Sequence, residues 1–282
     1  MVLLSFDLEE FDMPHEYGKA ISIDEQIAIS TEGALLILAI LQSFNIKATF
    51  FCTANFARLN PSLISRICAD GHEVASHSYF HSEFRTEHYS ESREFLETIT
   101  GRPVCGFRMP RMMPVDDREL QKAGYLYNSS FNPTFLPGRY NNLKAPRTYF
   151  MQDGILQIPA SVSPQLRIPL FWLSFHNFPL PFYKRLCERT YQKDRYLNLY
   201  FHPWEFTNLR DRQKLGMPFY VARNSGEDMA LRFRKLLAWM RDKRYRFGRF
   251  QDFMEQVRVE RSEPTFLLEP DVDPHGNYSH QD

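Results

Sequence analysis

The stretch Gly71–His81, GHEVASHSYFH, joins a short apolar segment to three of the chain's nine histidines. The segment HEVAS is predicted to form a buried β-strand, and Gly71 ends the helix that precedes it. We interpret His72, which lies inside the strand pattern, as structural. His77 and His81 are four residues apart, a spacing that places two imidazoles on one face of a helix. They could be metal ligands, or a solvated or packed pair without chemistry.

Short apolar segments alternate with helical segments on both sides of this stretch. The residues between 131 and 181 break the alternation, because they are rich in Pro and aromatic residues and predict loops and a hairpin. Regular alternation of strands and helices predicts an α/β fold with a parallel sheet or barrel. The strands are predicted at 1–6, 47–52, 72–76, 104–108, 125–128, 196–202 and 245–248, and the helices at 23–45, 61–71, 90–101, 115–124, 181–193, 226–243 and 250–257.

Length and charge narrow the class of protein. A chain of 282 residues can bury the core of one large α/β domain. Its 34 basic residues balance its 34 acidic residues, so the total charge favours neither nucleic acid nor an anionic membrane surface as a partner. We therefore expect a small neutral substrate or one held by a few directed contacts.

The apolar segments and the cysteines bear on location. Asp7 interrupts the first apolar segment too early for a signal peptide. We expect no membrane span, because no segment approaches the ~18 consecutive apolar residues that one needs. The four cysteines are far apart and form neither a metal-binding pair nor a disulfide framework. We interpret them as reduced core thiols, which predicts a cytoplasmic protein.

Polar side chains gather where the predicted strands end. Catalytic side chains of a (β/α) barrel lie at the carboxyl ends of its strands, so one shared site is the simplest interpretation. The residues at these ends are Asp7, Glu9, His77, His81, Arg108, Asn128, His202 and Glu205.

Four motifs occur in the order and approximate spacing of a known family: SFDLEEF, SHSYFH, GFRMP and YFHPWEF. Over residues 2–257 the chain resembles the polysaccharide deacetylase family, the NodB homology domain. Its HPWE ending is similar to a branch associated with exopolysaccharide biosynthesis. The resemblance implies a distorted (β/α)7 TIM-like barrel as a catalytic domain over residues 1–260. The polar residues 261–282 lack periodicity and predict an extended or disordered tail.

The resemblance also implies an activity and roles for single residues. It implies a metal-dependent carbohydrate N-deacetylase, a hydrolase of linear amide C–N bonds that removes N-acetyl groups from amino sugars of a glycan or glycan precursor. Asp7 would be the base, His77 and His81 metal ligands, and His202 the acid, with Arg108 holding Asp7 ionised. Two imidazoles and a carboxylate suit Zn²⁺, with Co²⁺, Mn²⁺ or Fe²⁺ as alternatives.

The sequence leaves open which residue is the third metal ligand, because Leu8 stands where many members of the family carry a ligating aspartate. Side chains alternate along a strand, so Asp7 and Glu9 point to one side while Leu8 and Glu10 point to the other. This alternation favours Glu9 as the ligand. The alternative is that Glu9 and Glu10 are loop carboxylates and that the metal keeps only the histidines.

Two further residues are candidates for substrate binding. Arg111 could bind substrate or be solvated, and the ring of Trp204 could stack on a sugar or pack beneath its loop. An N-acetylated carbohydrate is the expected substrate. The alternative functions are an amidase acting on a non-sugar amide or cyclic ureide, and a noncatalytic carbohydrate-binding barrel.

Overall fold

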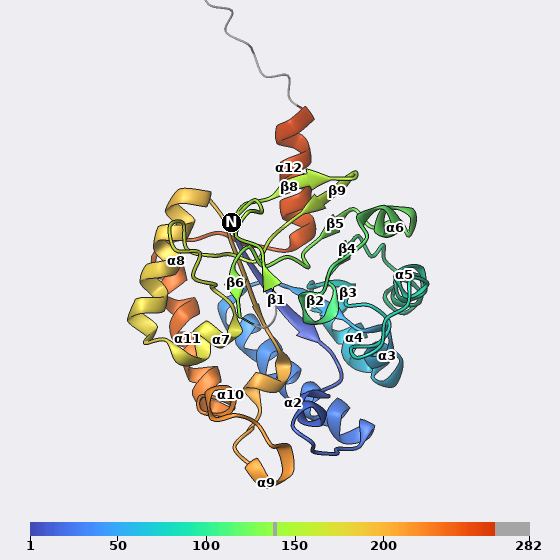
Figure 1. The fold of residues 1–282 in the computed structure, drawn as a ribbon, viewed down its shortest axis with the longest axis vertical. Coiled ribbons are helices and arrows are strands. Elements are labelled where there is room, and N and C mark those ends of the chain that lie inside the picture. Colours follow the sequence, from blue (N-terminus) through green and yellow to red (C-terminus); the bar gives the residue numbers. More distant parts are fainter. Residues whose placement is uncertain (138–139, 263–282) are drawn as a thin grey trace, which may run out of the picture.

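The computed structural model describes residues 1–137 and 140–262, and its centre is a curled, mostly parallel sheet (Figure 1). The strand order is β10-β1-β2-β3-β4-β5-β9-β8, and β11 also pairs with β1. A separate two-stranded hairpin is formed by β6 (Phe135–Leu136) and β7 (Tyr140–Asn141). The strands of the main sheet are β1 (Val2–Leu8), β2 (Thr49–Cys52), β3 (Glu73–Ser76), β4 (Gly106–Phe107), β5 (Tyr127–Asn128), β8 (Phe150–Gln152), β9 (Ile155–Gln157), β10 (Leu197–Phe201) and β11 (Phe247–Gly248).

The strands from β10 to β9 run parallel, and the chain beyond β9 closes them into a barrel. The amide of Ser161 donates to the carbonyl of Asn198 in β10 over 3.0 Å, and Ser161 Oγ accepts from the amide of Asn198 over 2.8 Å. The side chain of Asn198 also donates to the carbonyls of Ile158 and Pro159, at 3.1 and 3.0 Å. The predicted distorted (β/α)7 barrel is confirmed. Hydrogen bonds from the side chain of Asn198 help to join β10 to the chain after β9.

Helices cover the outside of the barrel, and capping residues explain their ends. The longest helix begins after Ser22, whose hydroxyl accepts from the Glu25 amide, and ends at Asn45 in the left-handed conformation. The α-helices are α1 (Met13–Glu16), α2 (Ile23–Phe44), α3 (Ala54–Leu59), α4 (Pro61–Ala69), α5 (His88–Thr100), α6 (Asp117–Lys122), α7 (Trp172–Asn177), α8 (Leu180–Asp194), α9 (Arg212–Leu215), α10 (Phe219–Ala222), α11 (Glu227–Asp242) and α12 (Phe250–Ser262), and the 3₁₀ turns are η1 (Pro110–Met112) and η2 (Pro203–Phe206).

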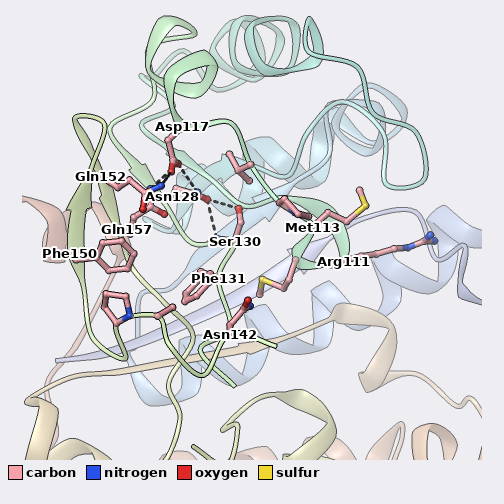
Figure 2. A pocket seen from close by; sticks show the side chains of 15 residues that line it. Arg111, Met113, Asp117, Asn128, Ser130, Phe131, Asn142, Phe150, Gln152 and Gln157 are labelled. Carbon is pink, nitrogen blue, oxygen red and sulfur yellow. Dashed lines mark hydrogen bonds between the residues drawn. The ribbon is translucent and has the colours of Figure 1, made fainter. Parts of the chain in front are cut away.

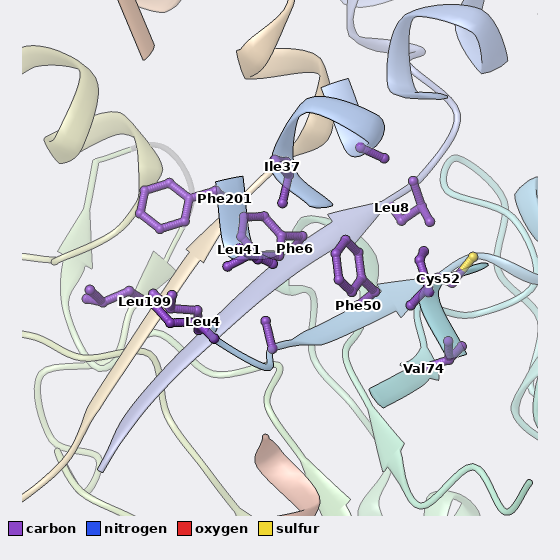
Figure 3. Packing of buried hydrophobic residues seen from close by; sticks show 14 of the residues in the cluster. Leu4, Phe6, Leu8, Ile37, Leu41, Phe50, Cys52, Val74, Leu199 and Phe201 are labelled. Atoms are coloured by element: carbon purple, nitrogen blue, oxygen red, sulfur yellow. The ribbon is translucent and has the colours of Figure 1, made fainter. Parts of the chain in front are cut away.

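The alternation of β1 divides the core into two layers. Leu4, Phe6 and Leu8 pack outward against α2 and the neighbouring strands (Figure 3). Leu3 packs inside the barrel with Phe51 of β2. Because side chains alternate, Asp7 is on the same face of β1 as Leu3, and it points into the barrel.

Helix α12 closes the amino end of the barrel. Phe250, at its start, belongs to the interior cluster. The amide of Phe250 donates to Thr49 Oγ1 over 3.0 Å, and the amide of Gln251 donates to the buried carboxylate of Glu73 over 3.0 Å. Thr49 and Glu73 are the first residues of β2 and β3. Helix α12 therefore closes the barrel interior at this end, and the interior opens at the carboxyl end.

Helix α2 is a core helix with one unusual contact. It is long and apolar enough to cross a membrane by length and composition alone, which differs from our expectation of no such segment. Its buried residues, which include Ile37 and Leu41, pack on the barrel instead (Figure 3). A Cβ on Gly33 would collide with the backbone of Pro203 in η2, so this glycine allows α2 and η2 to approach closely.

The C-terminal residues and the four cysteines bear on two expectations from the sequence. The tail expected from residue 261 begins as helix, since α12 continues to Ser262, and residues 263–282 lie outside the described residues. The division into a domain of residues 1–260 and a tail therefore stays a prediction. All four cysteines are free thiols, of which Cys105 alone is partly exposed. The cytoplasmic location also stays a prediction.

Candidate active site

A cavity of about 340 Å³ opens at the carboxyl end of the barrel. Its walls come from the ends of β1 and β10, from the loop after β3, and from the segments around η1 and α7. Glu9, His77, His81, His202 and Asp7 all line it, so residues far apart in the sequence meet in one place.

Three side chains in this cavity form a candidate metal centre. Oε2 of Glu9 lies 3.1 Å from Nε2 of His77 and 3.0 Å from Nε2 of His81. Ligands bound at the usual zinc distances of about 2.0–2.2 Å lie about 3.4 Å apart at the corners of a tetrahedron, so these spacings are close to those of a metal site. Burial opposes ionisation of Glu9, but the neighbouring His81 and His77 hold its pKa well below the usual range. The three residues fit a divalent cation.

Hydrogen bonds at the opposite ring nitrogens orient both imidazoles. Nδ1 of His77 donates to the carbonyl of Arg108 over 2.8 Å, and Nδ1 of His81 donates to Oδ1 of Asp12 over 2.8 Å. These acceptors direct both Nε2 atoms toward Glu9, which is the usual arrangement of ligating histidines. Burial opposes a charge on His81, but Glu9 and Asp12 raise its pKa to about 9.

The loop after β3 brings the two histidines together without a helix. Residues 77–87 are irregular, and Ser78 has a φ of 67°. The amide of His77 donates to the Cys52 carbonyl over 2.8 Å, and the carbonyl of Ser78 accepts from the amide of Ala54 over 3.1 Å. The imidazole centres of His77 and His81 lie 5.9 Å apart, with the rings stacked. The prediction that they share a helix face is therefore wrong, because contacts to β2 and α3 hold the loop.

Glu9 and Glu10 point in opposite directions, as alternation along a strand predicts. Glu10 accepts hydrogen bonds from Thr53 Oγ1 at 2.8 Å and Asn55 Nδ2 at 2.5 Å, at the start of α3. Both oxygens of the Glu10 carboxylate are thus hydrogen-bonded to residues at the start of α3. Glu9 instead receives the indole N–H of Trp204 at its other oxygen, over 3.2 Å.

Asp7 is held by a buried arginine. Nη1 of Arg108 donates to Oδ1 of Asp7 over 2.5 Å, while its Nε and Nη2 donate to the carbonyl and hydroxyl of Ser129 at 3.2 and 3.0 Å. The guanidinium carbon also lies 4.0 Å from the centre of the Phe51 ring. Asp7 Oδ2 faces His202, with Nε2 of that histidine 3.8 Å away.

His202 is oriented by a buried carboxylate. Its Nδ1 donates to Oε1 of Glu205 over 2.9 Å, and Oε2 of Glu205 pairs with Nε2 of His176 over 2.8 Å. Burial opposes protonation of His202, but the hydrogen bond to Glu205 raises its pKa above the usual range. The Nε2 atom of His202, on the opposite side of the ring from Glu205, faces Asp7 in the cavity.

The two expected substrate-binding residues lie at different depths. Arg111 is at the rim, where its Nη2 lies 3.4 Å from Oδ2 of Asp12 and 3.1 Å from Oε1 of Glu16. Trp204 is only 1% exposed, and its ring stacks on His202 with centres 4.6 Å apart. The position of Trp204 is that of the packing alternative rather than that of an open sugar platform.

Four residues of the site received no role from the sequence. Glu205 lies in the HPWE motif three residues after His202, and this short spacing was the available signal. Asp12 is one of several acids after β1, without a pattern that distinguishes it. His176 and the ring of Trp172, which lies 5.4 Å from His202, come from α7 within the irregular middle of the chain. Nothing local in the sequence indicates that α7 lies over the site.

Comparison with known proteins agrees with this description. Residues 20–126 match the family model described as polysaccharide deacetylase, and residues 129–255 match a domain of unknown function (DUF3473). The uncharacterized protein YlxY of Bacillus subtilis is 47% identical over 72 residues, which are 23% of this chain and 23% of that protein. The peptidoglycan-N-acetylmuramic acid deacetylase PdaA of Bacillus subtilis is 29% identical over 63 residues, 22% of this chain and 24% of PdaA. The chain thus spans about a quarter of these curated relatives.

Similarity to solved structures extends over the whole fold. A Mycobacterium smegmatis protein assigned as a polysaccharide deacetylase is 19% identical and has a TM-score of 0.64, with 96% of this chain and 94% of that chain covered. The architecture therefore defines a (β/α)7 barrel with a candidate metal centre at the carboxyl ends of its strands. Residues 20–126 belong to the polysaccharide deacetylase family, and residues 129–255 match the DUF3473 family.

Proposed function

We propose that the protein is a metal-dependent N-deacetylase that hydrolyses the acetamide of an amino sugar within a glycan. The observation that carries this proposal is the pair Asp7 and His202. Each is fixed by a buried partner, Arg108 or Glu205, and both border the cavity that contains the three candidate metal ligands. A base and an acid at one metal site are the groups that amide hydrolysis needs.

Asp7 and His202 each carry out one of the two proton transfers. Oδ1 of Asp7 is engaged by Arg108, so Oδ2 accepts the proton of the attacking water as its oxygen bonds to the acetyl carbon. Nε2 of His202 then donates a proton to the amine nitrogen as the C–N bond breaks, which releases acetate and the free amino sugar. Glu205 stabilises the protonated form of His202 before this transfer.

The cation is proposed to be Zn²⁺, held by Glu9, His77 and His81. Nitrogen and carboxylate ligands suit zinc, and Co²⁺, Mn²⁺ or Fe²⁺ could occupy the same set. When bound, the ion would polarise the acetamide carbonyl. PdaA, which is named for deacetylation of N-acetylmuramic acid in peptidoglycan, supports an amino-sugar substrate.

The test is metal analysis of the purified protein together with acetate release. The metal-loaded protein should release acetate from N-acetylated amino sugars or their oligomers, and His77→Ala should abolish both metal retention and release. Hydrolysis of cyclic ureides or simple amides without acetate release would favour the amidase alternative. Glycan binding without any turnover by metal-loaded protein would favour the noncatalytic alternative.

A further inference from the structure

The fully buried His176 of α7 is joined to His202 through a single carboxylate. Nε2 of His176 donates to Oε2 of Glu205 over 2.8 Å. The other oxygen of Glu205, Oε1, accepts from Nδ1 of His202 at 2.9 Å and from the backbone amide of that residue at 2.5 Å. His176 is not among the described residues that line the catalytic cavity, so it can act on a substrate there only through other side chains.

Hydrogen bonding fixes where His176 carries its proton. An ionised carboxylate only accepts, so the nitrogen that faces Glu205, Nε2, carries the hydrogen. Nδ1 is buried and has no hydrogen-bond partner among the described residues. A proton on Nδ1 would be a buried donor without an acceptor, which is costly. His176 is therefore a neutral donor, and the positive charge of the protonated cluster belongs to His202.

The backbone of α7 is held by side chains that come from the chain after η2. Nε of Arg232 donates to the carbonyl of Phe175 over 2.7 Å, and Nδ2 of Asn224 donates to the carbonyl of His176 itself. The ring of Trp172 lies nearly perpendicular to the imidazole of His176, at an angle of 87° and with centres 5.9 Å apart. These contacts fix the direction of the His176 N–H, as a positioning group requires.

Another buried carboxylate of this chain, Asp117, provides a comparison (Figure 2). Its donors are three neutral carboxamides: Gln157 at 2.8 Å, Gln152 at 2.9 Å and Asn128 at 3.3 Å. Burial nevertheless raises the pKa of Asp117 above its usual range. Several neutral hydrogen bonds are thus not by themselves enough to keep a buried carboxylate easily ionised.

Glu205 differs from Asp117 in the direction of its pKa shift. Burial opposes ionisation of Glu205, but the hydrogen bonds from His176 and then from His202 lower its pKa below the usual range. Without His176, Oε2 would be buried without its donor. The carboxylate would then rotate or take up a proton, and either change would weaken the hydrogen bond from Oε1 to Nδ1 of His202.

We propose that His176 is a positioning residue for the general acid, because its N–H holds Glu205 in the orientation that fixes His202. With Nδ1 of His202 held by Glu205, Nε2 is the nitrogen that can give its proton to the departing amine. The inference rests on the proposed deacetylase function, in which His202 is the acid. Since His176 does not line the cavity, its loss should lower kcat and leave KM nearly unchanged.

The kinetic test measures acetate release from the β-1,4-linked tetramer of N-acetylglucosamine by the metal-loaded full chain. His176→Leu should lower kcat by about 10–100-fold, the effect of a misplaced catalytic group. His176→Gln should keep kcat within a few-fold of wild type, because its amide nitrogen can replace Nε2 as the donor. The matched control is Tyr183→Phe, which removes a buried hydrogen bond to the Leu170 carbonyl beside α7 and should leave kcat unchanged.

Nitrogen-15 NMR of His202 tests the positioning role independently of turnover. In the wild type, neutral His202 should carry its hydrogen on Nδ1, because that atom donates to Glu205. His176→Leu should show a mixture of the two tautomers, whereas His176→Gln should show the wild-type tautomer. If His176→Leu does not fold, His176→Asn takes its place, since its amide is too short to reach Glu205.

The outcomes separate this inference from the proposed function. A wild-type tautomer of His202 in His176→Leu, or a kcat lowered no more than by Tyr183→Phe, would overturn the positioning role and keep the deacetylase. Equal losses of kcat in His176→Leu and His176→Gln would also overturn it, because the shape of the ring rather than its N–H would then matter. A wild type that releases no acetate, together with the expected change of tautomer, would overturn the deacetylase and keep the positioning of His202 by His176.

Discussion

Nη1 of Arg108 donates to Oδ1 of Asp7 over 2.5 Å, and the two side chains are 0% and 4% exposed. The pair is therefore almost wholly removed from water. Removing one member of a buried ion pair leaves an uncompensated charge in a low-dielectric environment. Arg108 thus contributes to the stability of the barrel as well as to the orientation of Asp7.

Replacing Arg108 tests this contribution. Arg108→Met should lower the free energy of unfolding by about 3–5 kcal/mol, as measured by denaturant titration, because Asp7 would remain buried without its partner. The double variant Asp7→Leu/Arg108→Met should recover part of that loss. Arg118→Met is the control, since Arg118 is 78% exposed and its ion pair should contribute no more than about 1 kcal/mol. If Arg108→Met lowered the free energy of unfolding no more than Arg118→Met does, the buried pair would not be needed for stability.

The pairing of His202 with Glu205 predicts a pH dependence. Activity requires Asp7 ionised and His202 protonated, so kcat/KM should be bell-shaped. Glu205 raises the pKa of His202, which keeps the acid protonated to higher pH and moves the alkaline limb upward. Glu205→Gln should therefore shift the alkaline limb to lower pH.

Two comparisons check this interpretation of His202. His202→Ala should lower turnover by about 10²–10⁴-fold, the usual effect of losing a general acid. Glu119→Gln, a change at a half-buried position of α6 outside the catalytic cavity, should leave the pH profile unchanged. Turnover of His202→Ala within a few-fold of wild type would mean that His202 is structural.

Adjacent glutamates provide a matched test of the metal centre. Glu9→Gln should weaken metal affinity, measured by competition with a chelator, because it removes the carboxylate beside His77 and His81. Glu10→Gln should retain the metal but lose stability, by about 1–3 kcal/mol, because an amide nitrogen replaces one of the two oxygens that accept from Thr53 and Asn55. The reverse order would mean that Glu10 supplies the ligand.

Asp12 is expected to act on the metal through His81. Asp12→Asn should weaken metal affinity by about 10–100-fold, because partners of ligating histidines have effects of this size. Glu16→Gln is the control, since Glu16 pairs with Arg111 rather than with His81. Equal affinities of both variants would exclude Asp12 as the group that orients His81.

Gly33 should be sensitive to the smallest side chain. In a helix, alanine is normally favoured over glycine by about 1 kcal/mol. Gly33→Ala should nevertheless lower Tm and kcat, because its Cβ would push Pro203, and with it His202, out of position. Calorimetry and acetate release measure the two effects. Glu32→Ala, at the exposed neighbouring position, should change neither quantity. A higher Tm for Gly33→Ala would show that η2 can move away from α2 without loss of stability.

Local patterns, which act over a few residues, predicted a parallel sheet or barrel, and the family resemblance implied the distorted (β/α)7 barrel. Alternation along β1 predicted that Asp7 and Glu9 point to the same side of the strand, and both line the catalytic cavity. The apolar segments likewise located the parallel strands within a few residues at each end, except β9, which lies in the segment predicted as loops and a hairpin. The helix expected for His77 and His81 failed, because contacts from α3 decide the conformation of that loop.

The sequence by itself determined the order of strands and helices, and its motifs indicated Asp7, Glu9, His77, His81 and His202 as one cluster. Periodicity and short motifs carry this information, since they depend only on neighbouring residues. The resemblance already paired Arg108 with Asp7, and tertiary structure alone decided the partners of His81 and of Glu205. Asp12 meets His81 across 69 residues and Glu205 meets His176 across 29 residues. Such pairs form only when closure of the barrel brings distant loops together, and no local pattern encodes that distance.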